Sequence, residues 1–385
     1  MMLTKLGEFT LLAIATLTIM VGAALAPGLN SIANELGVSE YASFLITLPA
    51  LGAILFAPVF GKFIDTHGAR KVLMISLLGY GVCGLLGMFL YGPIMVAVDR
   101  IVLGGFTAGV MASGTAVISD LYRGQARLNM IAKQGMSIEL GGCLFLFAGG
   151  LLSEVSWQGP FLLYSFALLF MLFMWKAIPV YEYRQKNAVA APHLLTTEPS
   201  TASQAKAGKI THIMVYSILA MTTFFSMFVI LPVLLGDLGF SQAQTGFFLS
   251  FISFIAVLSA MVMPKVVTRF DERVTLRLAF VSYALAHTAF ASSSNLYVLV
   301  MASMLAGIGF GLSIPLLNHA TVLVSDESNR GKNLALFAMA VFLGQFLTSL
   351  LELSPFTIST TLLVCALASM ITALNVKRSF AGKPN

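Results

Sequence analysis

Charged residues are scarce in this chain. Lys, Arg, Asp and Glu make up 10% of its 385 residues and hydrophobic residues 58%, whereas soluble domains carry about 25% charged residues. This composition excludes a water-soluble fold of this length, because so much apolar surface could not all be buried. The repeated apolar stretches instead match the roughly 20 residues that a helix needs to cross a bilayer core of about 30 Å. We therefore expect a helical, polytopic membrane protein.

Cysteine is scarce as well. The 3 cysteines, Cys83, Cys143 and Cys365, lie within apolar segments, where they read as small buried hydrophobes rather than as a disulfide framework or metal site. No His/Glu metal spacing and no activated nucleophile is evident, so a membrane enzyme is not supported. The net charge of +6 does not indicate a nucleic-acid partner, because the positive residues lie at the ends of apolar segments, as in membrane proteins.

Twelve apolar segments are long enough to cross a membrane. By residue number they are 10–29, 41–60, 72–90, 94–118, 135–152, 160–179, 213–235, 244–263, 276–292, 296–324, 334–351 and 356–374. The polar stretch after the sixth contains Pro, Ser, Thr and Lys, a composition typical of a linker. We predict an N-terminal six-helix bundle in residues 1–180, a cytoplasmic linker in 181–210 and a C-terminal six-helix bundle in 211–385.

Lys and Arg residues occur in alternate loops, in the linker and at both termini, while the remaining loops carry acids: Glu35, Glu40, Glu154 and Asp237. Because cytoplasmic loops are enriched in Lys and Arg, we expect both termini and the linker on the cytoplasmic side. The chain is then a multi-pass protein of a cell membrane, the inner membrane of a bacterium, and is expected to act as a monomer.

The loop between spans 2 and 3 carries a motif. It reads Gly61-Lys-Phe-Ile-Asp65-Thr-His-Gly68-Ala-Arg70-Lys-Val-Leu73. The glycines allow a tight turn and close helix approach, and Asp65 can meet the positive end of a helix or a basic side chain. The corresponding loop of the second half, 264–276, has Thr268 in place of the acid and Asp271 in place of the second glycine. This is weak internal repetition, as paired six-helix halves show.

These features resemble the major facilitator superfamily. The 61–73 loop resembles the family's loop between helices 2 and 3, and Asp99-Arg100, followed by glycines at helical spacing, resembles its helix 4. The resemblance covers nearly the whole chain and implies an all-α integral membrane fold of twelve helices in two pseudo-symmetric bundles. It also implies a conformational latch on the cytoplasmic face, formed by Gly61, Asp65, Gly68, Arg70 and Asp120.

Within that family the chain resembles the twelve-helix drug:proton antiporters, with one departure. Their helix 5 carries an extended Gly/Pro pattern. When the chain is aligned on Gly141, Gly149 and Gly150, the positions that should hold Gly, Gly and Pro are occupied by Ala132, Phe145 and Leu146. The helix 5 antiporter motif is therefore degraded.

Two charges lie deep in the apolar segments of the first half. Arg100 sits well inside a span, and Glu139 is the deepest acid. An intramembrane charge is costly and by default marks a functional site. We assign Arg100, Glu139 and Asp99 to transport and proton coupling, with Glu139 as a candidate partner of Arg100. The alternative is a structural ion pair, for which Asp99 is the rival partner although neighbouring helical side chains point about 100° apart.

The second half offers neutral polar and His side chains instead. His287 and His319 are single residues in apolar helices, where a hydrogen-bonded core His is the commoner role and a proton carrier the rarer one. Hydroxyl and amide groups in these helices can bond to neighbouring helices or to a substrate. The candidate substrate cavity is Thr222, Ser226, Asn318, His319 and Gln345.

The leading functional hypothesis is proton-driven export of small amphiphilic compounds by alternating access. The proton gradient would supply the energy without a cofactor or metal, and the partners would be a small-molecule substrate and the lipid bilayer. One alternative is a carrier of an organic anion or metabolite, with Arg100 as the carboxylate anchor. A second alternative is a lipid translocator with the same fold.

Overall fold

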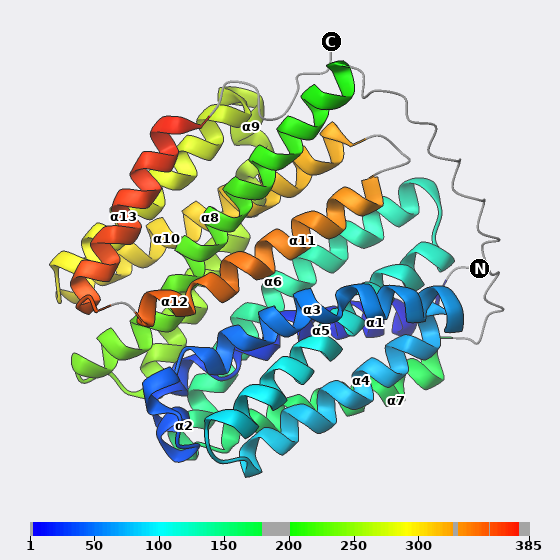
Figure 1. The fold of residues 1–385 in the computed structure, drawn as a ribbon, viewed down its shortest axis with the longest axis horizontal. Helices are drawn as coiled ribbons and strands as arrows, with labels where there is room; N and C mark the ends of the chain where they lie inside the picture. Colours follow the sequence, from blue (N-terminus) through cyan, green and yellow to red (C-terminus); the bar gives the residue numbers. More distant parts are fainter. Residues whose placement is uncertain (1–2, 179–200, 326–329, 354, 377–385) are drawn as a thin grey trace. The chain divides into compact units, whose positions relative to one another are not determined.

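The computed structural model describes residues 3–178, 201–325, 330–353 and 355–376. These residues form helices joined by short loops, with no strand among them (Figure 1). The all-α fold predicted from the sequence is confirmed. Most of the predicted linker, 181–210, lies outside the described residues, and its last part forms the start of a helix.

The first half contains seven α-helices and four short 3₁₀ turns within the described residues. They are α1 (Lys5–Ala23), η1 (Ala26–Gly28), α2 (Leu29–Glu35), η2 (Ser39–Tyr41), α3 (Phe44–His67), α4 (Ala69–Leu86), η3 (Gly87–Phe89), α5 (Pro93–Leu121), α6 (Gly124–Val155), η4 (Gly159–Tyr164) and α7 (Ser165–Ala177). Pro27 interrupts the first apolar stretch at η1, because proline has no backbone N–H to donate to a continuing helix.

The second half contains six helices within the described residues. They are α8 (Thr201–Asp237), α9 (Gln242–Ser292), α10 (Leu296–Val324), α11 (Arg330–Leu347), α12 (Ser349–Glu352) and α13 (Ile358–Asn375). α9 has 51 residues and is interrupted at Asp271, whose φ of 73° and ψ of 171° are not helical.

The twelve predicted spans correspond to eleven helical stretches in the described residues that are long and apolar enough to cross a membrane. The difference arises in α9, which contains both predicted segments 244–263 and 276–292. At 1.5 Å per residue its 51 residues would reach about 77 Å, more than twice the bilayer core of about 30 Å. α9 therefore supplies two crossings that meet at the Asp271 break.

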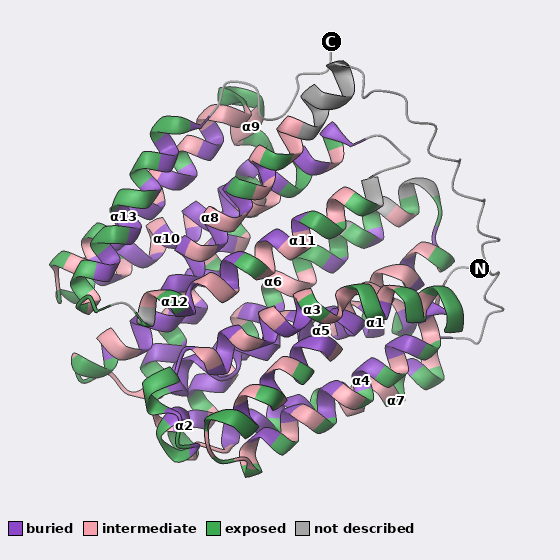
Figure 2. Cartoon of the chain, viewed as in Figure 1, coloured by how far each residue is buried: buried purple, intermediate pink, exposed green. Residues whose placement is uncertain are grey.

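Exposed residues occur along whole helices rather than only at their ends (Figure 2), and many of them have large apolar side chains. On α4 they recur at helical spacing, at Ile75, Leu78, Val82 and Leu86, and on α13 a similar row includes Leu363, Leu367, Ile371 and Leu374. A soluble protein would leave such rows in contact with water at a large cost in free energy. They are the lipid-facing surfaces of a membrane protein.

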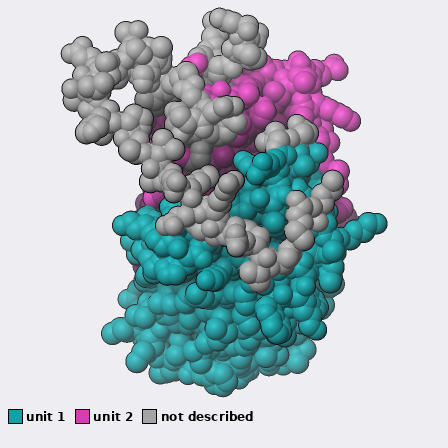
Figure 3. All heavy atoms as spheres, turned by 90° about the vertical axis from the view of Figure 1, so that its right-hand side faces the viewer, with its two compact units in different colours: residues 1–185, 228–253 teal, residues 186–227, 254–385 magenta. Residues whose placement is uncertain are grey.

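The described helices divide into two compact units (Figure 3). Unit 1 comprises Met1–Gln185 and Phe228–Ser253, and unit 2 comprises Lys186–Met227 and Phe254–Asn385. The end of α8 and the start of α9 thus pack with the first half of the chain. The predicted bundle boundaries at 180 and 211 stay a prediction.

Close helix packing in unit 1 depends on small residues. A Cβ at Gly104 of α5 would overlap the carbonyl group of Pro49 in α3, and a Cβ at Gly52 would overlap that of Ile101. Such approaches let helices pack backbone to backbone, a usual arrangement where lipid removes the hydrophobic driving force between helices. The glycines after Arg100 therefore fix the position of α5 and of its charged residue.

The internal repeat is visible in the backbone of the two corresponding loops. Gly68, between α3 and α4, has φ 85°, and Asp271 in α9 has φ 73°. Two residues later, Arg70 Nε donates to the carbonyl oxygen of Ile178 at 3.1 Å, and Arg273 Nε donates to that of Val376 at 3.0 Å. Both acceptors immediately follow the last helix of their half. The sequence alignment of Asp271 with the second glycine is therefore supported by the structure.

Candidate functional site

Arg100 on α5 is sealed inside unit 1, with 1% of its side chain exposed. Its Nη2 and Nε donate to Oδ2 of Asp99 at 2.7 and 3.0 Å. Among the described residues this is the ion pair that Arg100 makes, and none joins it to Glu139. The two neighbouring side chains meet despite their different directions of exit from the helix, because the flexible arginine folds back onto Asp99.

Aromatic rings enclose the guanidinium on its other sides. Its central carbon lies 5.5 Å from the ring centroid of Phe161 and 5.8 Å from that of Tyr164, within the range of cation–π attraction. A Cβ at Gly87 would overlap Nη2, so only glycine leaves room for the charge there. This geometry is compatible with the structural ion pair, the alternative weighed in the sequence, while the assignment of Arg100 and Asp99 to transport stays a prediction.

The arginine cluster also holds the end of α1. Nη1 of Arg100 donates to the Tyr164 hydroxyl at 3.5 Å, and that hydroxyl donates to the carbonyl oxygen of Val21 at 2.9 Å. Because α1 ends at Ala23, its last carbonyls lack helical partners, and Tyr164 satisfies one of them. Tyr80 of α4 donates to the Leu17 carbonyl at 2.7 Å. Sequence analysis missed both tyrosines.

Glu139 on α6 is half-buried. Among the described residues no ion pair or hydrogen bond to its carboxylate is recorded. Residues three and four positions along a helix share its face. A Cβ at Gly142, three positions on, would touch Ile19 of α1 at 3.5 Å, and Cys143, four positions on, contacts Ser250 of α9. At these neighbouring positions α6 packs against α1 and the start of α9, within unit 1.

The start of α9 crosses α6 closely at Gly150 and Gly246. A Cβ on Gly246 would lie 2.8 Å from Cα of Gly150, and one on Gly150 would lie 2.8 Å from Cα of Gly246. One turn further, the Ala243 N–H donates to Oε2 of Glu154 at 3.1 Å. The crossing holds the start of α9 against the second half of α6, within unit 1.

The predicted latch residues lie at the end of unit 1 where α3 and α5 end and α4 begins. Gly61 and Asp65 lie on the last turns of α3, Gly68 makes the turn to α4, and Asp120 is exposed on the last turn of α5. Arg70 binds the Ile178 carbonyl. These positions share one end of the bundle, while a latch between the two halves stays a prediction.

The same end carries a hydrogen bond that sequence analysis missed. The Tyr122 hydroxyl, just after α5, donates to Oε1 of Glu8 in α1 at 2.9 Å. Burial and the bonded Glu8 carboxylate raise the pKa of Tyr122 to about 12, so the hydroxyl keeps its proton at neutral pH. The bond ties the first turn of α1 to the end of α5.

The candidate cavity residues of unit 2 belong to different contacts. Thr222 donates to the Gly344 carbonyl of α11 at 2.9 Å, next to Gln345, which is 8% exposed. Ser226 lies 2.9 Å from Nε2 of His287. Asn318 and His319 are exposed on α10. Among the described residues of unit 2, no hydrogen bond joins any two of these five side chains, and their assignment to a substrate cavity stays a prediction.

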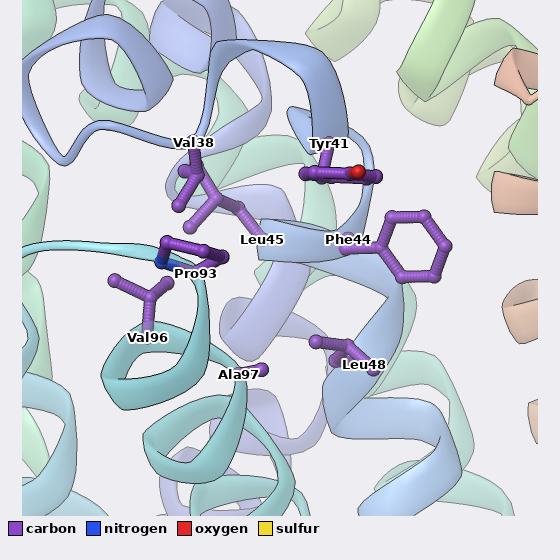
Figure 4. A pocket seen from close by; sticks show the side chains of 8 residues that line it. All are labelled: Val38, Tyr41, Phe44, Leu45, Leu48, Pro93, Val96 and Ala97. Atoms are coloured by element: carbon purple, nitrogen blue, oxygen red, sulfur yellow. The ribbon is translucent and has the colours of Figure 1, made fainter.

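A pocket of about 310 Å³ lies in unit 1 between the first turns of α3 and α5 (Figure 4). Its lining is almost wholly apolar: Val38, Tyr41, Phe44, Leu45, Leu48, Pro93, Val96 and Ala97. It offers a hydrophobic surface with no charged group in its lining. Within the described residues no three His, Cys, Asp or Glu side chains lie close enough to share a metal ion.

Comparison with known proteins gives one family. The profile described as the Major Facilitator Superfamily matches residues 11–349. The class B tetracycline resistance protein of Escherichia coli is 27% identical over 312 residues, which cover 78% of this chain and 74% of that protein. Multidrug resistance protein 1 of Bacillus subtilis (strain 168) is 29% identical over 150 residues, 37% of each chain.

Solved structures agree in fold. The nucleoside transporter NupG superposes with a TM-score of 0.76 at 14% identity, covering 96% of this chain and 98% of that one. A bacterial homolog of the human lysosomal transporter Spinster, in an inward-facing and occupied conformation, gives a TM-score of 0.75 at 14% identity, covering 98% of both chains. At such identities the likeness shows the fold alone.

Proposed function

The chain belongs to the major facilitator superfamily and is a multi-pass membrane transporter, and we propose that it exports small amphiphilic compounds in exchange for protons. The tetracycline and multidrug resistance proteins among its relatives support efflux as the direction. In this proposal the protein lies in a bacterial inner membrane with both termini cytoplasmic, and alternating access occurs around a central site.

The difference between the two intramembrane charges carries the proposal. Arg100 is neutralised by Asp99 and is 1% exposed, whereas Glu139 is half-buried with no partner recorded among the described residues. A carboxyl without a fixed partner can take up and release a proton as its surroundings change between conformations. Glu139 is thus the coupling acid of the proposal, and Arg100 and Asp99 support the fold around it.

The same observation disfavours the organic-anion alternative. An arginine that anchors a substrate carboxylate has to present free N–H groups to a cavity. In unit 1, three donors of Arg100 are already bonded to Asp99 and Tyr164, and Phe161 covers the guanidinium. A carboxylate would have to displace Asp99 from a sealed position before it could bind.

Transport in proteoliposomes with an imposed pH gradient tests the proposal. Gradient-driven movement of a neutral amphiphile, with counter-movement of protons read by a pH dye inside the vesicles, should be lost in Glu139→Gln. The matched control is Glu35→Gln, an exposed acid on α2, which should transport normally. The proposal fails if Glu139→Gln keeps full gradient-driven transport.

A further inference from the structure

We propose that α4 and α7 form a binding site for a phospholipid with an anionic headgroup. In this site Lys71 and Lys176 hold the phosphate of the headgroup, and the exposed apolar rows of the two helices hold the acyl chains. The site lies on the lipid-facing surface of unit 1. It does not depend on the export proposal, because none of its residues takes part in that proposal.

α4 and α7 pack side by side in unit 1 and run in opposite directions (Figure 1). A Cβ on Gly81 of α4 would lie 2.7 Å from Cδ2 of Leu168 in α7. Eleven positions earlier on α4, Arg70 Nε donates to the carbonyl oxygen of Ile178, which follows the end of α7. One end of the pair therefore holds the first turn of α4 beside the last turn of α7.

At this end, each helix has a lysine in line with its exposed apolar row. On α4, Lys71 is exposed and lies four positions before Ile75, the first residue of the exposed row described above. On α7, Lys176 is exposed and lies three positions after Phe173 and seven after Leu169, which are exposed as well. Residues at such spacings share one face of a helix. Each lysine therefore ends a lipid-facing row.

Both rows face the same side of the helix pair. At about 100° per residue, Lys71 lies about 80° around α4 from Gly81, and Lys176 lies about 80° around α7 from Leu168, in the same sense along the chain. Because the helices are antiparallel and touch at Gly81 and Leu168, these equal rotations place both lysines on one side of the contact. The two ammonium groups thus lie within reach of one headgroup.

The two helices do not neutralise these ammonium groups. α4 and α7 contain no Asp or Glu, and among the described residues no ion pair or hydrogen bond to the side chain of Lys71 or Lys176 is recorded. The acids near this end belong elsewhere, since Glu8 accepts from the Tyr122 hydroxyl and Asp65 lies on α3. Two such cations at the membrane surface attract an anionic headgroup.

The position of this end in the bilayer suits such a lipid. In the orientation predicted from the loops it is cytoplasmic, the side whose leaflet carries anionic lipids. Trp175, beside Lys176, is 64% exposed, and tryptophan is typical of the interface between headgroups and acyl chains. From Lys71 to Leu86 the row on α4 rises by about 22 Å, more than half of the bilayer core of about 30 Å. An acyl chain can therefore contact the row along its whole length.

Unit 2 has the same turn and the same arginine bond without the two lysines. The position that corresponds to Lys71, three after the turn, holds Val274. The position that corresponds to Lys176, two before the carbonyl bound by the arginine, holds Leu374, which is 70% exposed. Arg277, a nearby cation of unit 2, donates to the Leu374 carbonyl at 3.2 Å. The packing of these helices therefore does not require either lysine, as expected if the lysines serve a ligand.

Fluorescence of Trp175 tests the site directly. In full-length protein with Trp157→Phe, Trp175 is the one remaining tryptophan. The protein is placed in phosphatidylcholine vesicles that contain a low fraction of brominated phosphatidylglycerol or of brominated phosphatidylcholine, because bromine on an acyl chain quenches tryptophan only at short range. Phosphatidylglycerol should quench more strongly, with a relative binding constant raised about fivefold by each lysine.

Variants locate the preference. Lys71→Gln and Lys176→Gln should each lower it about fivefold, the double variant should abolish it, and Lys71→Arg should keep it. Lys62→Gln is the matched control, because it removes the same charge from an exposed position on α3 and should leave the preference unchanged. Equal quenching by the two lipids overturns the site. So does an effect of Lys62→Gln as large as that of Lys71→Gln, because the attraction would then come from the whole charged face.

Thermal unfolding in detergent gives a second measurement that does not depend on fluorescence. Added phosphatidylglycerol should raise the melting temperature of the parent protein, because it binds the folded state, and should not raise that of the double variant. An equal rise in both proteins overturns the site. Weak quenching of Trp175 by both brominated lipids would show that another protein surface, such as a second copy of the chain, covers α4 and α7, and this also overturns the proposal.

Discussion

α4 in the first half and the part of α9 that follows Asp271 in the second half begin with the same kind of turn, but the buried residues further along the two helices differ. Gly68 and Asp271 make the turn with positive φ, and Arg70 and Arg273 then hold the carbonyl after the final helix of their half. Twelve positions after each turn, from 68 to 80 and from 271 to 283, a buried tyrosine follows.

Beyond the tyrosines the two halves diverge. In unit 1 the glycine at position 84 leaves room for Tyr164, which leads to Arg100 and Asp99. In unit 2 the position sixteen residues after the turn, as Gly84 is after Gly68, holds His287, bonded to Ser226 and to the Tyr283 carbonyl. Both halves therefore share the backbone turn and the arginine clamp, by which we mean the bond from Arg70 or Arg273 to the carbonyl after the last helix of its half. They differ in what they bury, which is an ion pair in unit 1 and a neutral cluster in unit 2.

Substitutions in these buried groups should change the free energy of unfolding most, and the ion pair of unit 1 more than the neutral cluster of unit 2. Asp99→Asn would leave the Arg100 charge buried without its counter-ion, which should lower the free energy of unfolding by about 3–5 kcal/mol. Thermal unfolding in detergent measures the loss. The double variant Asp99→Leu, Arg100→Met should lose less, because no charge is left unpaired. If Asp99→Asn melts like the native protein, the ion pair is not structural.

The neutral cluster of unit 2 should matter less. His287→Leu removes one partner of the Ser226 hydroxyl, which still donates to the Thr223 carbonyl at 2.7 Å, and should cost about 0.5–1.5 kcal/mol. Ser226→Ala and the double variant complete a thermodynamic cycle, whose coupling energy isolates the 2.9 Å contact. A loss in His287→Leu as large as that in Asp99→Asn would contradict the contrast between charged and neutral clusters.

The two arginine clamps should respond alike. Arg70→Ala and Arg273→Ala each remove a charged hydrogen bond to a helix-end carbonyl and should each cost about 1.5 kcal/mol, the low end for charged donors, because both are only partly buried. Lys71→Ala, on the exposed neighbour of Arg70, is the control. If only one of the two variants, Arg70→Ala or Arg273→Ala, loses stability, the two arginine clamps are not equivalent.

Replacing Asp271 by glycine in the turn of α9 should change the free energy of unfolding least. Asp271→Gly relieves a left-handed backbone but removes the bond from the Val274 N–H to Oδ1 at 2.8 Å, so stability should change by less than about 1 kcal/mol. Asp271→Val keeps the strain and should cost about 1–2 kcal/mol. Equal melting temperatures of the two variants would show that the positive φ is not retained.

Particular residues show where prediction from sequence succeeded and failed. Asp271 was aligned with a glycine on loop spacing alone, and its positive φ agrees. The partner of Arg100 could not be chosen, because the choice between Asp99 and Glu139 depends on how a long side chain folds and on which helix covers it. The contact of Cys143 with Ser250 was not foreseen either, since hydropathy does not say which helices are neighbours.

The sequence by itself determined the order of the membrane-spanning segments, because each span must be apolar over the bilayer's thickness and each break requires polar, Gly or Pro residues. Only the tertiary structure decided which buried charge is satisfied. That depends on packing: the space at Gly84 and Gly87 admits Tyr164 and the guanidinium, and so seals Arg100 within unit 1 with Asp99 as its counter-ion.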